Sequence, residues 1–160
     1  MQNRMLKTRG DAASLGLEDL LNFRVQRLAS KMTLLTTREV LAGTGVHIAE
    51  WRVICRLIEN GPLKLTELSQ MLGLDPGHTS RLLKAAETKG LVRRERDPSD
   101  GRASFFHPTP KSRNVFDDAW PRACQSADAF HDLYTDDERD ELKRLLDRAI
   151  RYANESLYAK

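Results

Sequence analysis

The order of the short elements in residues 46–108 constrains this chain more than any other feature of its sequence. Turn and breaker residues divide the run into a helix over 47–59, an extended segment over 63–65, a short helix over 66–72 and a further helix over 76–89. Asp75 can accept hydrogen bonds from the free N–H groups at the start of that last helix, and Pro76 fits its first turn because no donor is needed there. Three helices joined by tight turns are therefore expected to pack around one small core.

A β-hairpin is predicted directly after these helices. Two extended segments, 91–96 and 103–107, flank a polar turn that contains Pro98 and the pair Asp100-Gly101. Helix, short strand, helix, turn, helix and hairpin is the order of a winged helix-turn-helix. In this fold one helix braces a second helix that enters the major groove of DNA, and the hairpin lies beside it as a wing. We therefore predict a mostly α-helical fold with a two-stranded β-hairpin wing.

The helix over 76–89 is the predicted reading helix. Its residues Leu83 and Ala86 are expected to face the core, which leaves the opposite side for DNA. Arg81 suits the edge of a guanine, whereas Lys84 suits a phosphate. The DNA-binding residues predicted from this helix and from the wing are His78, Thr79, Ser80, Arg81, Lys84, Arg94, Arg96, Asp100 and Arg102.

Long amphipathic helices are predicted on both sides of this central region. Apolar residues recur at intervals of three and four over 17–41, over 115–130 and over 142–157. Pro121 lies inside the second of these stripes, so we expect that helix to be kinked or broken near Trp120. Apolar faces this long need a partner surface, and in a chain of 160 residues a second subunit can supply it.

Charge is distributed unevenly along the chain. Residues 81–113 carry nine basic and four acidic side chains, whereas residues 114–160 carry seven basic and eleven acidic ones. This asymmetry indicates a polyanion bound near the middle, although a solvated basic face is an equal alternative on charge alone. We expect no membrane association, because no apolar run approaches the roughly 20 residues that a spanning helix needs. Two cysteines and a polar N-terminus make a reducing cytoplasm the expected compartment.

The region from Val46 to Arg102 resembles the MarR family of transcriptional regulators. The matching segments are Glu50-Trp51-Arg52-Val53-Ile54, Leu65-Thr66-Glu67-Leu68-Ser69, Leu72-Gly73-Leu74-Asp75, Ser80-Arg81-Leu82, Lys89-Gly90-Leu91-Val92-Arg93-Arg94 and Asp100-Gly101-Arg102. The last of these resembles the family's Asp-x-Arg wing signature. Three departures stand out, namely Pro108–Arg113 after the wing, Thr79 in the reading helix, and Ala85-Ala86 behind it.

The resemblance implies a homodimer in which each subunit presents one winged helix to half of a palindromic operator. It implies that Arg102 borders the minor groove, and that Asp100 holds the wing arginines with Arg94 as its partner. The chain then divides into a mobile arm (1–16), an N-terminal dimerisation helix (17–45), the winged helix-turn-helix (46–108) and C-terminal dimerisation helices (109–160). We expect a transcriptional repressor, not an enzyme, with double-stranded DNA and a second copy of itself as partners.

A small effector such as an aromatic acid is a further expectation from the resemblance. The residues considered for binding it are Arg24, Arg27, His47 and Trp51. Trp120 is considered with them, although each of these residues could instead belong to the core or the surface. No cofactor and no metal are expected, because no histidines stand at a tight metal-ligand spacing. Cys55 is expected to be a packed, inert thiol. The alternative to a DNA-binding regulator is a winged-helix module that binds proteins and no longer binds DNA.

Overall fold

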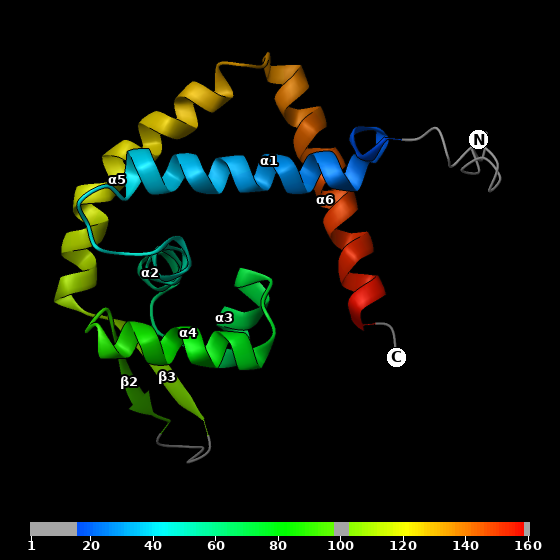
Figure 1. The fold of residues 1–160 in the computed structure, drawn as a ribbon. Coiled ribbons are helices and arrows are strands. Elements are labelled where there is room, and N and C mark those ends of the chain that lie inside the picture. Colours follow the sequence, from blue (N-terminus) through cyan, green and yellow to red (C-terminus); the bar gives the residue numbers. More distant parts are fainter. Residues whose placement is uncertain (1–15, 98–102, 159–160) are drawn as a thin grey trace.

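The computed structural model describes residues 16–97 and 103–158. Its elements are a 3₁₀ turn η2 (Leu17–Asp19), α1 (Leu21–Leu35), a π-helical turn η3 (Thr36–Val40), α2 (Ile48–Asn60), β1 (Leu63–Lys64), α3 (Leu65–Leu72), α4 (Pro76–Thr88), β2 (Val92–Arg96), β3 (Ser104–Pro108), α5 (Pro110–His131) and α6 (Asp136–Tyr158). Every helix and strand that the sequence predicts between residues 46 and 108 is present. Figure 1 shows α1 crossing above a lobe that α2, α3, α4 and the hairpin form.

The core of this lobe is built by the apolar faces of three helices and the sheet. Leu57 of α2, Leu68 of α3 and Leu83 of α4 are almost fully buried, together with Phe106 of β3. Truncating a buried leucine of this kind to alanine costs roughly 2–5 kcal/mol of stability. Gly73 ends α3 with a left-handed backbone (φ 65°), which turns the chain tightly enough for α4 to begin at residue 76.

The hairpin belongs to a three-stranded antiparallel sheet with the order β1-β3-β2. The two residues of β1 pair with β3, Leu63 opposite Phe106 and Lys64 opposite Phe105. The sequence predicts the extended segment at 63–65 but not its pairing with the wing. Because Lys64 is also the residue that precedes α3, the wing is attached directly to the start of the helix-turn-helix.

A buried ion pair joins the ends of two helices inside the lobe. The Glu50 carboxylate, in the first turn of α2, lies 2.9 Å from Lys89 Nζ at the end of α4, and it also accepts the His47 backbone N–H. The Glu50 side chain is only 5% exposed, so losing its partner would leave an uncompensated buried charge. Lys111 Nζ of α5 donates to the Lys89 carbonyl at 2.8 Å, which brings the start of α5 to the same point.

Helix α5 is continuous from residue 110 to residue 131, although Pro121 lies inside it. Of the two outcomes predicted near Trp120, a kink or a break, the break does not occur, and the bend of α5 around the end of α1 is visible in Figure 1. Proline removes one backbone donor and crowds the preceding turn, which bends a helix without ending it when other contacts hold both halves. Arg122 provides one such contact, because its Nε donates to the Val40 carbonyl of η3 at 3.0 Å.

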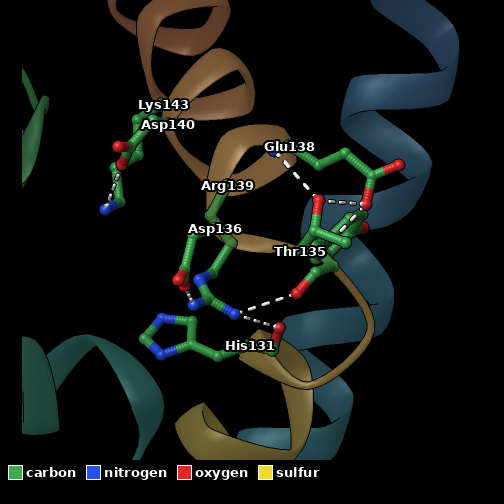
Figure 2. A network of polar contacts seen from close by, with 8 residues as sticks. His131, Thr135, Asp136, Glu138, Arg139, Asp140 and Lys143 are labelled. Carbon is green, nitrogen blue, oxygen red and sulfur yellow. Dashed lines mark hydrogen bonds and ion pairs between the residues drawn. The ribbon is translucent and has the colours of Figure 1, made fainter.

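The turn between α5 and α6 is held by polar contacts that Figure 2 shows from close by. The Arg139 guanidinium donates to the carbonyls of His131 and Tyr134 and also pairs with Asp136. Thr135 and Glu138 form the capping box that the sequence predicts, with the Thr135 N–H 2.9 Å from the Glu138 carboxylate. One arginine thus satisfies carbonyls at the end of α5 from a position inside α6.

Helices α1 and α6 expose rows of apolar side chains. On α1 the row includes Leu21 and Val25, and on α6 it includes Leu146, Ile150 and Leu157. None of the described helices is both long and apolar enough to cross a bilayer. The rows follow the stripes seen in the sequence, but no segment of the described chain covers them.

Candidate nucleic-acid interface

The start of α4 is fixed by Asp75, as the sequence predicts. Its carboxylate accepts the His78 backbone N–H at 2.9 Å, and Pro76 occupies the first helical position. This hydrogen bond holds the pKa of the exposed Asp75 carboxyl below its usual value. The carboxylate therefore remains ionised at neutral pH, and the first turn of the helix keeps one orientation.

One predicted contact residue on this helix cannot reach DNA. Thr79 is 0% exposed, and its hydroxyl donates to the Asp75 carbonyl at 3.0 Å. The prediction that Thr79 contacts DNA is wrong because the first turn of α4 directs this side chain into the core beside Leu83 and Ala86. A buried hydroxyl must find an acceptor, and the carbonyl four residues earlier supplies it.

The other polar residues predicted on α4 lie on its exposed side. His78, Ser80, Arg81 and Lys84 are all exposed. Successive positions at three- and four-residue spacing share a helix face, so these side chains form a continuous polar surface over the first half of the helix. This surface lies on the side of α4 opposite Leu83 and Ala86, which belong to the core shared with α2 and α3.

The two faces of the hairpin differ in charge. The register sets Arg94 opposite Phe106 and Arg96 opposite Ser104, so these side chains share one face of the sheet. Arg94 Nε donates to the Ser104 hydroxyl at 3.0 Å. Arg94 and Arg96 both remain exposed, as a DNA-contacting role requires.

The opposite face of the hairpin holds an ion cluster of its own. Arg93 lies 2.6 Å from the Glu95 carboxylate, and His107 Nε2 lies 3.3 Å from the same carboxylate. The hydrogen bond and charge of Arg93, with a smaller contribution from His107, lower the pKa of Glu95. The arginine at 93 is thus matched by an acid, whereas Arg94 is bonded to a neutral hydroxyl.

A cleft of about 600 Å³ separates α4 from the wing. Its basic and hydroxyl-bearing lining residues are Lys64, Thr66, Ser80, Lys84, Arg94 and Ser104, and its other lining residues are Leu65, Leu83, Glu87, Ala103 and Phe106. The cleft therefore brings together residues of the reading helix and of the wing that are distant in the sequence. Lys84 and Arg94 against the one carboxylate of Glu87 give it a positive balance, whereas the Lys64 ammonium pairs with Asp97.

The tip of the wing, residues 98–102, lies outside the described residues, and with it the predicted contacts Asp100 and Arg102. The predicted mobile arm over 1–16 also falls outside them, apart from Gly16. Asp97, at the base of the wing, is an acidic residue that the structure does describe. Its backbone N–H donates to the Ala103 carbonyl at 3.1 Å, and its carboxylate pairs with Lys64.

The residues considered for an effector lie in two separate places. Arg24 and Arg27 both contact Glu18, through its carbonyl and its carboxylate respectively. Trp51 is 6% exposed and stacks on Phe116 of α5 with 5.7 Å between ring centroids. Among the hydrogen bonds, ion pairs and ring contacts of the described residues, none joins these arginines to Trp51.

A stack of three aromatic rings links α2 to α5. Phe116 lies between Trp51 and Trp120, and its ring centroid is 4.8 Å from that of Trp120. Trp120 is 42% exposed, so the stack runs from the core to the surface. His47 is exposed one residue before α2 begins, at the same end of that helix as Trp51.

Sequence reasoning missed Lys64, Thr66, Asp97 and Ser104. Lys64 and Thr66 border the cleft because β1 pairs with β3, a contact between segments some 40 residues apart that no local pattern reports. Ser104 is visible only as the residue opposite Arg96 in the final register. Asp97 carried a weak signal, since an Asp-Pro pair is typical of a turn, but its burial carried none.

Three comparisons place this arrangement among known proteins. Residues 46–104 match the MarR family. The uncharacterised HTH-type transcriptional regulator YkoM of Bacillus subtilis (strain 168) is 34% identical over 106 residues, which are 66% of this chain and 68% of that protein. The PcaV transcriptional regulator from Streptomyces coelicolor, solved in complex with its natural ligand, is 22% identical with a TM-score of 0.77, covering 87% of this chain and 97% of that one.

CouR from Rhodococcus jostii RHA1, solved bound to p-coumaroyl-CoA, is 26% identical with a TM-score of 0.69, covering 82% of this chain and 92% of that one. The fold, the exposed polar side of α4 and the matches in sequence all indicate a winged helix-turn-helix of the MarR type. They also confirm the resemblance seen in the sequence and the expectation that the protein is not an enzyme. The chain belongs to the MarR family of DNA-binding transcriptional regulators.

Proposed function

We propose that this protein is a homodimeric repressor that binds a palindromic operator in double-stranded DNA and is released by a small effector. Its place of action is the cytoplasm, where the DNA partner is found. The observation that carries the proposal is the cationic cleft between α4 and the wing. A winged helix places its reading helix in the major groove and its hairpin over the adjacent minor groove, and these two grooves are separated by one phosphate backbone.

The cleft has the chemistry that a phosphate backbone requires. Lys84 and Arg94 approach it from α4 and from the wing, and the hydroxyl of Ser80 lies beside them. Phosphate contacts of this kind fix the register of a protein on the duplex, whereas base-edge contacts carry the sequence information. We assign Lys84 and Arg94 to phosphates.

Base readout belongs to the exposed start of α4 and to the wing. His78, Ser80 and Arg81 are exposed in the first half of the helix, where a reading helix contacts base edges. Arg81 can make a bidentate bond to guanine, worth roughly 1–3 kcal/mol of discrimination. From the wing we assign Arg96 and Arg102 to the minor groove, with Asp100 as a residue that orders them.

Dimerisation is supported by the exposed apolar rows of α1 and α6. Ile150 is 56% exposed and Leu21 is 75% exposed, and each belongs to a row of similar side chains. Contiguous apolar surfaces of this length on a water-exposed protein mark an interface, and a two-fold interface between identical chains is the commonest solution. Two reading helices would then reach half-sites about 34–36 Å apart, one turn of DNA.

The proposed effector is a planar aromatic acid bound where α5 meets α2. The Trp51–Phe116–Trp120 stack offers an aromatic wall there, and its accessible ring is Trp120. Of the candidates for the acid group, His47 lies at the Trp51 end of α2 and could donate a hydrogen bond to it, whereas Arg24 and Arg27 lie apart and contact Glu18. A neighbour in fold, BpsR of Bordetella bronchiseptica (17% identical, TM-score 0.75), has its DNA binding regulated by 6-hydroxynicotinic acid, a planar aromatic acid, which supports this class of molecule. Release requires that the effector favour one arrangement of the lobes by about 1–3 kcal/mol.

Fluorescence anisotropy with the protein's own promoter DNA tests DNA binding. The titration is run at two salt concentrations and against an unrelated duplex of the same length. We expect affinity for the promoter to exceed that for the unrelated duplex, and to fall with salt by a log–log slope of about −0.9 for each phosphate neutralised. Binding that ignores both sequence and salt would overturn the proposal in favour of a protein-interaction module.

Arg81→Ala tests the assignment of base readout. We expect a loss of about tenfold or more in promoter affinity and weaker discrimination at one base pair of each half-site. The control is Arg148→Ala in α6, which removes the same charge from an exposed position outside the lobe. Equal affinities for wild-type protein and Arg81→Ala would remove Arg81 from the interface.

Transcription in vitro from the same promoter tests repression, and 6-hydroxynicotinic acid serves as the effector probe. Repression relieved by the probe supports the full proposal, and quenching of tryptophan fluorescence reports its binding near Trp51 and Trp120. Activation by the protein would overturn the repressor assignment. Relief without quenching would move the effector site away from the aromatic stack.

A further inference from the structure

The wing is attached to the body of the protein by a very short strand. Only Leu63 and Lys64 of β1 pair with the hairpin, and both pair with β3. Lys64 also caps the start of α3, where its backbone N–H donates to the Glu67 carboxylate at 2.6 Å. The backbone of Lys64 is thereby fixed to the helix-turn-helix. A residue that binds its side chain is therefore held in place relative to α3.

The Lys64 side chain reaches across the sheet to the far strand. Its Nζ lies 2.8 Å from the Asp97 carboxylate, one residue beyond the end of β2, and 4.9 Å from the centroid of the Phe105 ring on β3. Because β3 lies between β1 and β2, this ion pair spans all three strands. The Asp97 N–H also closes the base of the hairpin on the Ala103 carbonyl.

Burial makes this ion pair sensitive to the position of the wing. The Asp97 side chain is 5% exposed and that of Lys64 is 38% exposed. A carboxylate withdrawn from water is stable only while its partners hold it, so a tilt or slip of the hairpin that separated the pair would be costly. The pair therefore favours one placement of β2 and β3 relative to α3.

The alternation of side chains along the sheet separates this pair from the cleft. Lys64 lies opposite Phe105 and contacts its ring, whereas Arg94 lies opposite Phe106. Phe105 and Phe106 are neighbours in one strand, so their side chains point to opposite faces. The ammonium of Lys64 is consequently on the face away from the cleft that α4 and Arg94 share.

We propose that Lys64 and Asp97 are positioning residues that set the distance and tilt of the wing relative to α4, so that wing and reading helix fit adjacent grooves of DNA together. The inference rests on the proposed DNA-binding function and assigns to it two residues that touch no base. Groove separation in B-DNA is nearly fixed, so a protein that reads two grooves needs a fixed separation between its two reading elements. The ion pair supplies that constraint from the far side of the sheet.

The test compares base-pair discrimination in full-length variants on promoter DNA. Asp97→Asn and Lys64→Met each remove the pair, and Lys64→Arg retains it. We expect the first two to weaken promoter binding about tenfold, with discrimination lost at the base pairs under the wing and kept at those under α4. Lys64→Arg should bind like wild type, and the double variant should be no worse than either single one.

A direct role of Lys64 in binding phosphate makes the opposite prediction. Asp97→Asn leaves the lysine charge in place and removes a nearby acid, so binding would tighten and the salt slope would rise. Tighter binding by Asp97→Asn would therefore overturn the proposal. A merely structural role would lower discrimination equally at all positions, in step with the loss of stability in urea, and that result would overturn it too.

The proposed function and the positioning role would fail in different experiments. If the wild-type protein shows no sequence preference, the proposed function fails before any variant is compared. If wild type reads its promoter and all variants discriminate as it does, only the positioning role fails. Should Asp97→Asn not fold by circular dichroism, the comparison of Lys64→Met with Lys64→Arg decides the question, because both keep a long stem at a partly exposed site.

Discussion

The Cys55 thiol shows how much the surroundings of one residue alter its chemistry. It lies half-buried in α2, and desolvation, with a smaller contribution from Glu59, raises its pKa from 9.0 to about 12. Burial disfavours the thiolate, which is the reactive form of cysteine. At pH 8 the thiolate fraction of Cys55 is then on the order of a thousandfold lower than for a free thiol. Cys124 on α5 is exposed.

Thiol labelling at pH 8 should therefore distinguish the two cysteines. With an aromatic disulfide reagent, we expect one fast-reacting thiol per native chain and a second only after unfolding in urea. Cys124→Ser should remove the fast phase, whereas Cys55→Ser should leave it unchanged. Fast modification of Cys55 in the native protein would contradict the burial described here and reopen a redox role for this residue.

At the scale of single elements, Thr109 joins the start of α5 to the end of α4. Its hydroxyl accepts the Ser112 N–H at 3.2 Å and donates to the Gly90 carbonyl at 2.7 Å, while the Ser112 hydroxyl accepts the Thr109 N–H at 2.9 Å. The sequence predicts the cap from the Thr-Pro pair. The bond to Gly90 depends on where the hairpin returns the chain, so it is a consequence of packing.

Replacing this hydroxyl should have a measurable cost. Thr109→Val keeps the shape of the side chain but loses the cap and the bond to Gly90, and we expect a loss of about 1–2 kcal/mol in the free energy of unfolding in urea. Thr109→Ser keeps the hydroxyl and should remain close to wild type. A Thr109→Val protein as stable as wild type would show that water replaces both bonds.

Elements were easier to predict than the contacts between them. The helix over 76–89 and both strands were recognisable because caps, glycines and side-chain periodicity are local signals. Thr79 was assigned wrongly because helical periodicity leaves a residue at the edge of the apolar face ambiguous, and the packing of α4 decided its side. At Pro121 the sequence could not distinguish a kink from a break, because local rules do not include contacts such as Arg122 to Val40.

At the scale of the whole molecule, α6 presents an apolar face to solvent. Leu146 and Ile150 lie on this face and are 40% and 56% exposed. Helical geometry puts Arg151 on the opposite side of α6, and it too is exposed. The dimer that we propose would cover the first face and leave the second in water.

A charge placed on the apolar face should disrupt the proposed dimer. For Ile150→Glu we expect monomers in sedimentation equilibrium and a loss of about a hundredfold or more in operator affinity, because one lobe then binds without the other. Arg151→Glu introduces the same side chain one position along and should remain dimeric. If both variants stay dimeric, the subunits associate through another surface.

Local sequence patterns suffice to identify the helices and strands of the winged helix, their order and the family. Caps, breakers and apolar periodicity act over a few residues, and the segments matching the MarR family are contiguous, so all of these can be recognised without a structure. The exposure of His78, Ser80, Arg81 and Lys84, which we propose to contact DNA, follows from the same periodicity, whereas the burial of Thr79 does not.

The attachment of the wing, and the residues that lie between it and α4, could be seen only in the folded chain. The cleft, the Lys64–Asp97 pair, the Glu50–Lys89 pair and the aromatic stack of Trp51, Phe116 and Trp120 all join residues distant in the chain. Such contacts are set by sheet register and by the packing of side chains in a shared core, and many sequences with the same local pattern would pair differently. Their geometry is therefore a property of the folded chain as a whole.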